Sequence, residues 1–217
     1  IPGNHDAYIK TDKSQTTDLW ASYMDGDAES KAAKMVFPSL RQRGPVAIIG
    51  VSSAVPTAPF FATGRIGNKQ LELLAQILKQ TREQGLFRII AIHHGPLVDS
   101  NKFRKRLIDS ERFRSVINAH GAELILHGHG HYPVSDILIT ADAEIPVIGV
   151  ASASLLSSSK IKRAGYNVYD VNASSSDWKL QMQSFGYDQG TDKFLTREEK
   201  EFVLPRLQNS DISGQTL

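Results

Sequence analysis

The 217-residue sequence predicts an α/β fold, because short apolar runs alternate with helical patterns along most of the chain. The runs are rich in Ile and Val and nearly free of polar residues, as is typical of strands that are buried on both faces. The predicted strands are Val46–Val51, Arg88–Ile92, Glu123–Leu126 and Val147–Ala151.

Two helices are expected between these strands, at Asn68–Gln84 and Ser110–His120. Apolar residues recur in both at helical spacing, and a glycine follows each segment directly, as is common at helix ends. Asn68 and Ser110 are the expected N-caps, because short polar side chains can accept hydrogen bonds from the free N–H groups of the first turn.

The pattern changes after residue 165, where strands are no longer separated by helices. Tyr166–Val171 and Trp178–Phe185 alternate apolar and polar residues, which predicts an antiparallel pair. We therefore expect one domain over residues 1–186 and a polar C-terminal extension over 187–217, with a short helix around Thr196–Val203.

The composition suits a globular domain and excludes several kinds of site. The chain is 41% hydrophobic, and no apolar run approaches the roughly 20 residues of a membrane span. Basic and acidic residues nearly balance, at 25 against 23, so no global field attracts nucleic acid. There is no cysteine, so a metal would need nitrogen and oxygen ligands. The basic cluster Lys102–Arg106 suits either a solvated helix face or a phosphate-binding loop.

Five of the seven histidines follow the ends of two predicted strands. His93 and His94 follow one, and His127, His129 and His131 follow the other. Open α/β sheets place their functional sites beyond the carboxyl ends of strands, where rigid strands hold the loops that carry polar side chains. These clusters therefore predict a metal or catalytic site rather than scattered surface histidines.

The remaining two histidines differ from each other. His120 lies in the last turn of a predicted helix, where the helix dipole favours an imidazole, and no role is assigned to it. His5 lies in the opening segment Gly3-Asn4-His5-Asp6, which by itself could be a solvated turn. In His129-Gly130-His131, we expect the glycine to allow a sharp backbone, so that the two imidazoles can face two different ions.

Three segments together resemble signature blocks of the calcineurin-like metallophosphoesterases. They are Gly3-Asn4-His5-Asp6, His93-His94-Gly95-Pro96 and Gly128-His129-Gly130-His131, and the resemblance runs from residue 1 to about residue 186. The sequence is most similar to the bacterial branch that includes class III cyclic-nucleotide phosphodiesterases. The resemblance implies a four-layer α/β/β/α sandwich with two metal ions in its site.

The resemblance also implies a role for each matching residue. Asn4, His93 and His129 would bind one metal, and His131 would bind the other. The metals would be transition-metal ions such as Mn, Fe, Zn or Co, among which the sequence does not choose.

The residues beside these ligands receive roles of a different kind. His5 would contact the phosphoryl group and help to protonate the leaving oxygen, and Asp6 would orient His5 by a hydrogen bond. His94 could bind a metal or could support the ligands from behind.

The implied function is a metal-dependent phosphoric ester hydrolase in which two metals activate a water molecule. A phosphodiester such as a cyclic nucleotide is the first choice of substrate, and a phosphomonoester or a nucleotide pyrophosphate is the alternative. A scaffold that keeps the fold without catalysis, and a nuclease, are the competing classes. A small phosphate ester is therefore the expected partner, nucleic acid is not, and a cytoplasmic location is expected.

The sequence departs from the family pattern in one respect. The first two blocks of the family, an Asp-x-His and a Gly-Asp, supply most ligands of the first metal and the bridging Asp. No Asp-x-His occurs in the chain, and Gly26-Asp27 follows the Asn4 block and is taken as a coincidence. We therefore expect that the first part of the domain lies outside this sequence and that the 217-residue chain alone is inactive or weak.

Overall fold

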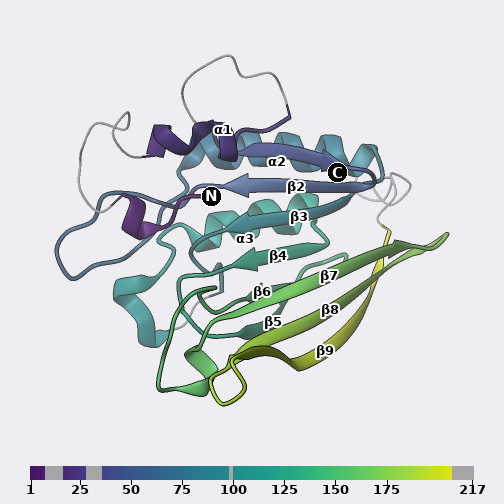
Figure 1. Ribbon diagram of the computed structural model, residues 1–217. Coiled ribbons are helices and arrows are strands. Elements are labelled where there is room, and N and C mark those ends of the chain that lie inside the picture. The colour runs from purple at the N-terminus through teal and green to yellow at the C-terminus, as the bar shows by residue number, and fades with distance from the viewer. Residues whose placement is uncertain (8–16, 28–35, 98–99, 207–217) are drawn as a thin grey trace.

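The computed structural model describes residues 1–7, 17–27, 36–97 and 100–206, and it confirms an α/β fold (Figure 1). Its larger sheet has six strands in the order β1-β2-β3-β4-β6-β5. The strands β2, β3, β4 and β6 are parallel, and β1 and β5 pair antiparallel at the two edges. Their bounds are β1 Ser39–Arg43, β2 Val46–Val51, β3 Phe87–Ile92, β4 Leu124–His127, β5 Val134–Ile139 and β6 Glu144–Gly149.

The four parallel strands are the four apolar runs expected from the sequence, with ends shifted by at most three residues. The edge strands β1 and β5 were not predicted, because polar residues interrupt both of them. Edge strands face solvent along one side and therefore carry a weaker apolar signal than central strands.

Two long helices, α2 (Asn68–Glu83) and α3 (Ser110–His120), confirm the predicted helical segments. The predicted caps are wrong by one residue, because Gly67 and Asp109 hold the N-cap positions. The carboxylate of Asp109 instead accepts the backbone N–H groups of Ile66 and Gly67 and so joins the starts of the two helices.

The other helices are short. They are α1 (Ala21–Met24) and the 3₁₀ helices η1 (Asn4–Asp6), η3 (Thr17–Trp20), η4 (Ser100–Lys105) and η5 (Lys160–Lys162). Among the described residues, no helix is both long and apolar enough to cross a lipid bilayer.

The smaller sheet is antiparallel and has the order β7-β8-β9. It comprises β7 (Gly165–Ala173), β8 (Asp177–Asp188) and β9 (Lys193–Pro205). The β7–β8 pair confirms the predicted antiparallel pair. The predicted helix around residues 196–203 is wrong, since these residues form part of β9.

Pairing with β8 explains why β9 is a strand. Phe202 lies opposite Leu180 and Leu204 lies opposite Trp178, so alternate side chains of β9 reach the core. The charged run before them faces solvent, and tertiary pairing overrides its local helical pattern. The expected division at residue 186 falls within β8 and stays a prediction, and residues 207–217 of the expected extension lie outside the described residues.

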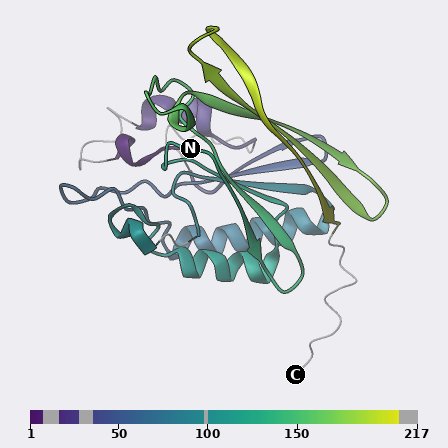
Figure 2. The same ribbon diagram turned by 90° about the horizontal axis from the view of Figure 1, so that it is seen from below.

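The layers can be followed in Figure 2. Helices α2 and α3 cover one face of the six-stranded sheet, and the three-stranded sheet covers the other. Besides α2 and α3, the helices of the described residues are α1 and four 3₁₀ helices, none longer than six residues, so this part of the chain shows three layers. The fourth, helical layer of the expected sandwich stays a prediction.

Candidate metal centre

The site lies where β3 and β4 end, next to the N-terminal segment (Figure 1). Strands β3 and β4 are parallel neighbours, and Ile92 lies opposite His127 at their carboxyl ends. The backbone N–H of Gly128 donates to the carbonyl oxygen of His93 at 3.1 Å and ties the two following loops together. The expected meeting of the two histidine clusters is therefore what the structure shows.

Asn4 reaches the same place from η1 and is only 2% exposed. Gly3 makes this approach possible, since a Cβ atom at Gly3 would lie 2.8 Å from Cε1 of His93. Asp6 accepts a hydrogen bond from the backbone N–H of Gly3 through Oδ2 at 2.7 Å. This bond closes the turn that presents Asn4, and the expected role of Asp6 in orienting His5 stays a prediction.

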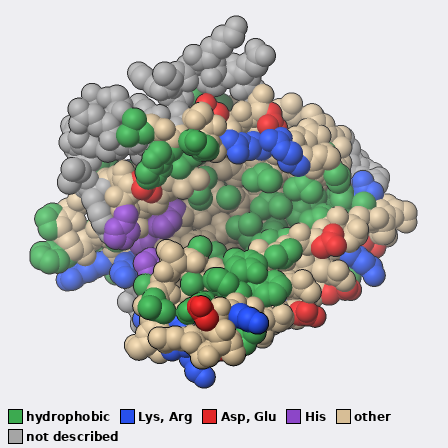
Figure 3. All heavy atoms as spheres, in the orientation of Figure 1, with side chains coloured by type: hydrophobic (Ala, Val, Ile, Leu, Met, Phe, Trp, Pro, Cys, Tyr) green, Lys and Arg blue, Asp and Glu red, His purple; other side chains and the backbone are tan. Residues whose placement is uncertain are grey.

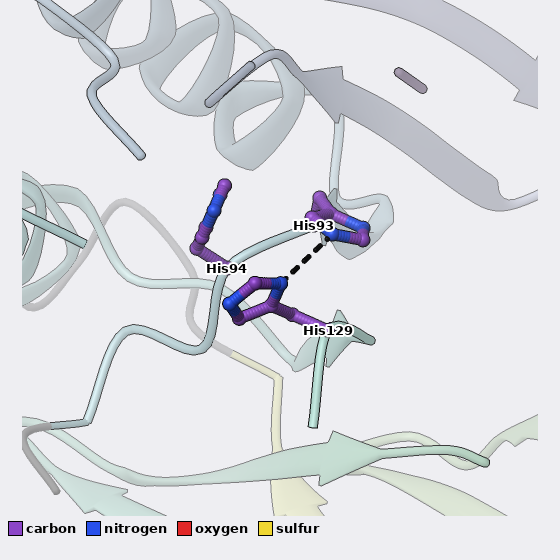
Figure 4. Close-up of side chains that lie close together, drawn as sticks. All are labelled: His93, His94 and His129. Carbon is purple, nitrogen blue, oxygen red and sulfur yellow. Dashed lines mark hydrogen bonds between the residues drawn. The ribbon is translucent and has the colours of Figure 1, made fainter. Parts of the chain in front are cut away.

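Three atoms of Asn4, His93 and His129 form a small triangle. Oδ1 of Asn4 lies 2.8 Å from Nε2 of His93 and 3.1 Å from Nδ1 of His129, and the two nitrogens are 3.2 Å apart. The His93–His129 contact is drawn in Figure 4. These are the three side chains that the resemblance assigns to one metal.

The triangle fits a metal ion better than it fits hydrogen bonding alone. The amide oxygen of Asn4 can only accept hydrogen bonds, so both imidazole nitrogens would have to carry a proton to donate to it. The two N–H groups would then point at each other and repel. Three donors that lie 2.8–3.2 Å apart can all approach one ion to the usual ligand distance of about 2.1 Å. The donor set of two imidazoles and one amide oxygen suits a transition metal.

Burial keeps these imidazoles neutral. Burial is the largest cause that lowers the pKa of His93 to about 4, and nearby histidines including His131 and His5 add to it. Burial also lowers the pKa of His129 to about 3, with His94, His93 and Lys105 contributing. A neutral imidazole keeps the lone pair that binds a metal.

His94 lies beside the triangle and has hydrogen-bond partners of its own. It is fully buried, and His93, His94 and His129 offer ring nitrogens within 4.8 Å of one another (Figure 4). However, Nε2 of His94 donates to the carbonyl oxygen of Ala62 at 3.1 Å, and the hydroxyl of Ser53 lies 2.7 Å from Nδ1 and donates to it. Both ring nitrogens therefore have hydrogen-bond partners, and His94 would have to give up one of these bonds to bind a metal.

His129 contrasts with His94 in this respect. Its Nε2 atom is buried and has no hydrogen-bond partner among the described residues. The triangle uses Nδ1 of the same ring, so Nε2 is a second nitrogen of His129 for which a partner is still to be found. The backbone of His129 also has φ of 63°, in the left-handed region that is strained for a side-chain-bearing residue. Strain of this kind gathers at functional sites.

The expectation about Gly130 is wrong in its detail. The left-handed conformations belong to His129 and to His131, whose φ is 58°, and not to the glycine between them. A Cβ atom at Gly130 would lie 3.0 Å from the ring of Tyr132, so the glycine is needed for space.

His5 and His131 lie on the exposed side of the triangle. Their charges are among the causes that lower the pKa of His93, which places both near the cluster. The described residues contain one group of three or more His, Cys, Asp or Glu side chains with metal-binding spacing, and His131 is not part of it. The assignment of His131 to a second metal and of His5 to the leaving oxygen therefore remains a prediction.

Sequence reasoning gave no functional role to Ser53, and it considered Lys105 only as part of the basic cluster that could bind phosphate. Ser53 is fully buried and donates a hydrogen bond to His94, which lies 41 residues further along the chain. The charge of Lys105, at the end of η4, helps to lower the pKa of His129. No local pattern marks either contact, because each depends on loops that meet only in the folded chain.

Comparison with known proteins gives distant structural likenesses. No protein family profile matches the chain, and no curated protein matches it in sequence. A dimetal phosphatase from Danio rerio is 14% identical with a TM-score of 0.43, and the likeness covers 66% of this chain and 40% of the other.

Two further solved structures are also similar. A phosphatase from Mycoplasma pneumoniae is 14% identical with a TM-score of 0.34, covering 84% of this chain and 63% of that one. Vps29 from Chaetomium thermophilum is 9% identical with a TM-score of 0.33, covering 83% and 67%. This chain thus spans less than two thirds of the length of both phosphatases, and TM-scores at this level do not establish a shared fold or activity.

Proposed function

We propose that this chain carries the metal-binding side of a phosphoric ester hydrolase whose substrate is a phosphodiester. The observation that supports the proposal most is the triangle of Asn4, His93 and His129, whose three donor atoms lie 2.8–3.2 Å apart. The three motifs that resemble the metallophosphoesterases supply the reaction class.

In this proposal the three residues of the triangle bind a metal ion, and the exposed histidines beside them act on the substrate. Asn4, His93 and His129 hold one metal, and His131 contributes to a second. A bound metal of this kind supplies Lewis-acid polarisation of phosphoryl oxygens and lowers the pKa of water near it. The chain has no cysteine, and Ser53, which donates to His94, is fully buried, so no covalent intermediate is invoked.

His5 serves the leaving group. Its side chain is exposed beside the triangle, where it can reach a bound ester and donate a proton to the departing oxygen. Asp6 holds the turn that carries both Asn4 and His5 through its bond to Gly3. In this proposal Asp6 positions the turn, and general acid help from His5 is expected to be worth about a hundred- to ten-thousandfold.

The test combines metal binding with a panel of substrates. Titration of the chain with Mn²⁺ or Zn²⁺ should show binding that Asn4→Ala weakens, because one corner of the triangle is lost. Turnover by the chain alone should be weak, since only His131 is assigned to the second metal. Hydrolysis should be faster for bis(p-nitrophenyl) phosphate than for p-nitrophenyl phosphate, and cyclic nucleotides should be cleaved.

Other outcomes would redirect the proposal. Faster hydrolysis of the monoester would identify a phosphomonoesterase, and cleavage of a nucleotide pyrophosphate alone would identify that link as the substrate. Metal binding without any turnover, in the chain and in any longer form of the protein, would indicate a scaffold. Failure to bind any of Mn, Fe, Zn or Co would contradict the metal centre itself.

A further inference from the structure

Two loops beside the metal centre form one surface feature, which we call the basic lip. It consists of residues 53–65, between β2 and α2, and residues 103–108. Backbone bonds join the two loops: Ala62 donates to the carbonyl of Arg104 at 2.8 Å, and Gly64 donates to that of Arg106 at 3.0 Å. Figure 1 shows the first of these loops extending away from the sheet.

Aromatic side chains project from the lip into solvent. Phe60 is 90% exposed and Phe103 is 59% exposed, although most proteins keep phenylalanine largely buried. The backbone of Phe60 has φ of 68°, so this exposed position is held in the strained left-handed region. A side chain that is 90% exposed has almost no neighbours, and it therefore does not line a concave pocket for a small ligand.

The lip carries positive charge without negative charge. Arg65, Arg104, Lys105 and Arg106 are exposed, and neither loop segment contains Asp or Glu. The guanidinium of Arg106 lies 4.2 Å from the ring centre of Phe103, so cation and ring share one surface.

Two acidic residues adjoin the lip, Asp109 and the exposed Glu111, and the four exposed cations of the lip outnumber them. Asp109, which follows directly, uses its carboxylate to accept the N–H groups of Ile66 and Gly67. The side chain of Lys102, expected in the same basic cluster, lies outside the described part of the chain. The described lip is therefore a local excess of cations on a chain whose total charge is nearly balanced.

The lip adjoins the metal centre. The carbonyl of Ala62 accepts the hydrogen bond from His94, and the charge of Lys105 acts on His129. Figure 3 shows histidine side chains at the surface next to Lys and Arg side chains, with hydrophobic side chains projecting at the edge of the molecule.

We propose that the basic lip docks this protein onto an anionic phospholipid membrane surface. The phenylalanines at the tips insert at the level of the headgroups, and the surrounding cations contact lipid phosphates. Docking would bring the metal centre close to the headgroup region. This inference goes beyond the proposed hydrolase function and does not depend on it.

Two other anionic partners explain the lip less well. A nucleotide would need rings that form a walled site, and Phe60 has no walls around it. Nucleic acid would be met by a longer basic track, whereas 25 basic and 23 acidic residues nearly cancel over the chain. An exposed aromatic pair with a ring of cations is the pattern typical of interfacial membrane anchors.

The test is co-sedimentation of the purified chain with phosphatidylcholine vesicles, with and without phosphatidylglycerol. Binding is expected to the anionic vesicles and should weaken at high salt, because surface charge is screened. The double variant Phe60→Ala/Phe103→Ala should bind at least about tenfold more weakly. Arg104→Gln/Lys105→Gln should lose about fivefold per cation and show a smaller salt effect.

Matched controls use exposed residues away from the lip. Ile139 is 75% exposed on β5, and Lys179 is exposed on β8, so Ile139→Ala and Lys179→Gln should bind like the wild type. All variants should keep the wild-type melting temperature, since the changed side chains are exposed.

Several results would overturn the proposal. Equal binding to neutral vesicles, equal binding by the lip variants, or no binding to either vesicle would each do so. Release of the protein by millimolar inorganic phosphate would mean that the lip is a subsite for a small phosphate. Binding of single-stranded DNA that the lip variants abolish, with no vesicle binding, would identify a nucleic-acid surface.

Discussion

The inner and outer halves of the candidate site are built differently. In the inner half, Asn4, His93 and His129 are held with their donor atoms 2.8–3.2 Å apart, and each comes from a segment fixed by backbone bonds. In the outer half, His5 and His131 are exposed. For the proposed site, this difference predicts that mutations can separate metal binding from turnover.

The difference has a structural cause. The inner histidines follow β3 and β4, which are buried strands, and His94 behind them is fixed by Ser53 and Ala62. A site supported by such a shell is preorganised for a metal. The outer residues are exposed, and in the proposed reaction they face the side from which a substrate would enter.

The largest effect is expected from breaking the inner half. His93→Ala removes one corner of the triangle and should lower metal affinity by more than about a hundredfold, since loss of even a supporting residue costs about ten- to a hundredfold. Turnover should fall below detection. Metal content measured after dialysis, together with hydrolysis of bis(p-nitrophenyl) phosphate, tests both effects.

The control for this variant is His120→Ala. His120 lies in the last turn of α3, away from the strand ends that carry the site, so its loss should change neither quantity. A His93→Ala protein that bound metal as tightly as the wild type would show that the triangle is not the metal site.

The next largest effect should come from the outer half. His5→Ala removes the proposed proton donor and should lower kcat by about a hundred- to ten-thousandfold in protein that hydrolyses the diester. Metal content should stay unchanged, because His5 is not a corner of the triangle. If His5→Ala instead emptied the site, His5 would be a ligand and the two halves would not be separable.

The parts of the fold that sequence predicted are those in which local pattern and tertiary burial agree. The strand β2 and the helix α3 have the predicted bounds, because apolar periodicity marks them and a glycine or turn ends them. In β9 the two signals conflict, since a charged run with a helical pattern pairs with β8 and sends Phe202 and Leu204 inward. Only the pairing with β8 determines that this segment is a strand and not a helix.

The same distinction applies to the site. Asn4, His93 and His129 could be proposed as a group because three motifs mark them, and the structure brings their donor atoms together. The hydrogen bond from Ser53 to His94 could not be predicted, since nothing in the pair Ser52-Ser53 indicates a partner 41 residues away. Sequence therefore predicts donors that carry motifs better than the contacts that fix them.

A smaller effect, on stability, is expected from a substitution that crowds the buried ring of His94. A Cβ atom at Gly64 would lie 2.6 Å from Cγ of the buried His94 ring, so Gly64→Ala should lower the free energy of unfolding by about 1–3 kcal/mol through overpacking. Urea unfolding of the metal-free chain measures this. At Gly190 the nearest atom to an added Cβ is 3.5 Å away, so Gly190→Ala is the matched control and should change stability little. Equal stability of the two variants would mean that His94 is not tightly held.

The smallest effect should be that of mild acid on metal affinity. Protons compete with the metal for imidazole, so affinity falls only as the pH approaches the pKa of the free ligands. Because burial lowers the pKa of His93 to about 4 and that of His129 to about 3, both are already neutral at pH 5.5. Kd measured calorimetrically with Zn²⁺ should therefore change by less than about twofold between pH 7.5 and 5.5. A loss of about a hundredfold over that range, as for two imidazoles of pKa about 6.5, would show that the metal is not held by His93 and His129.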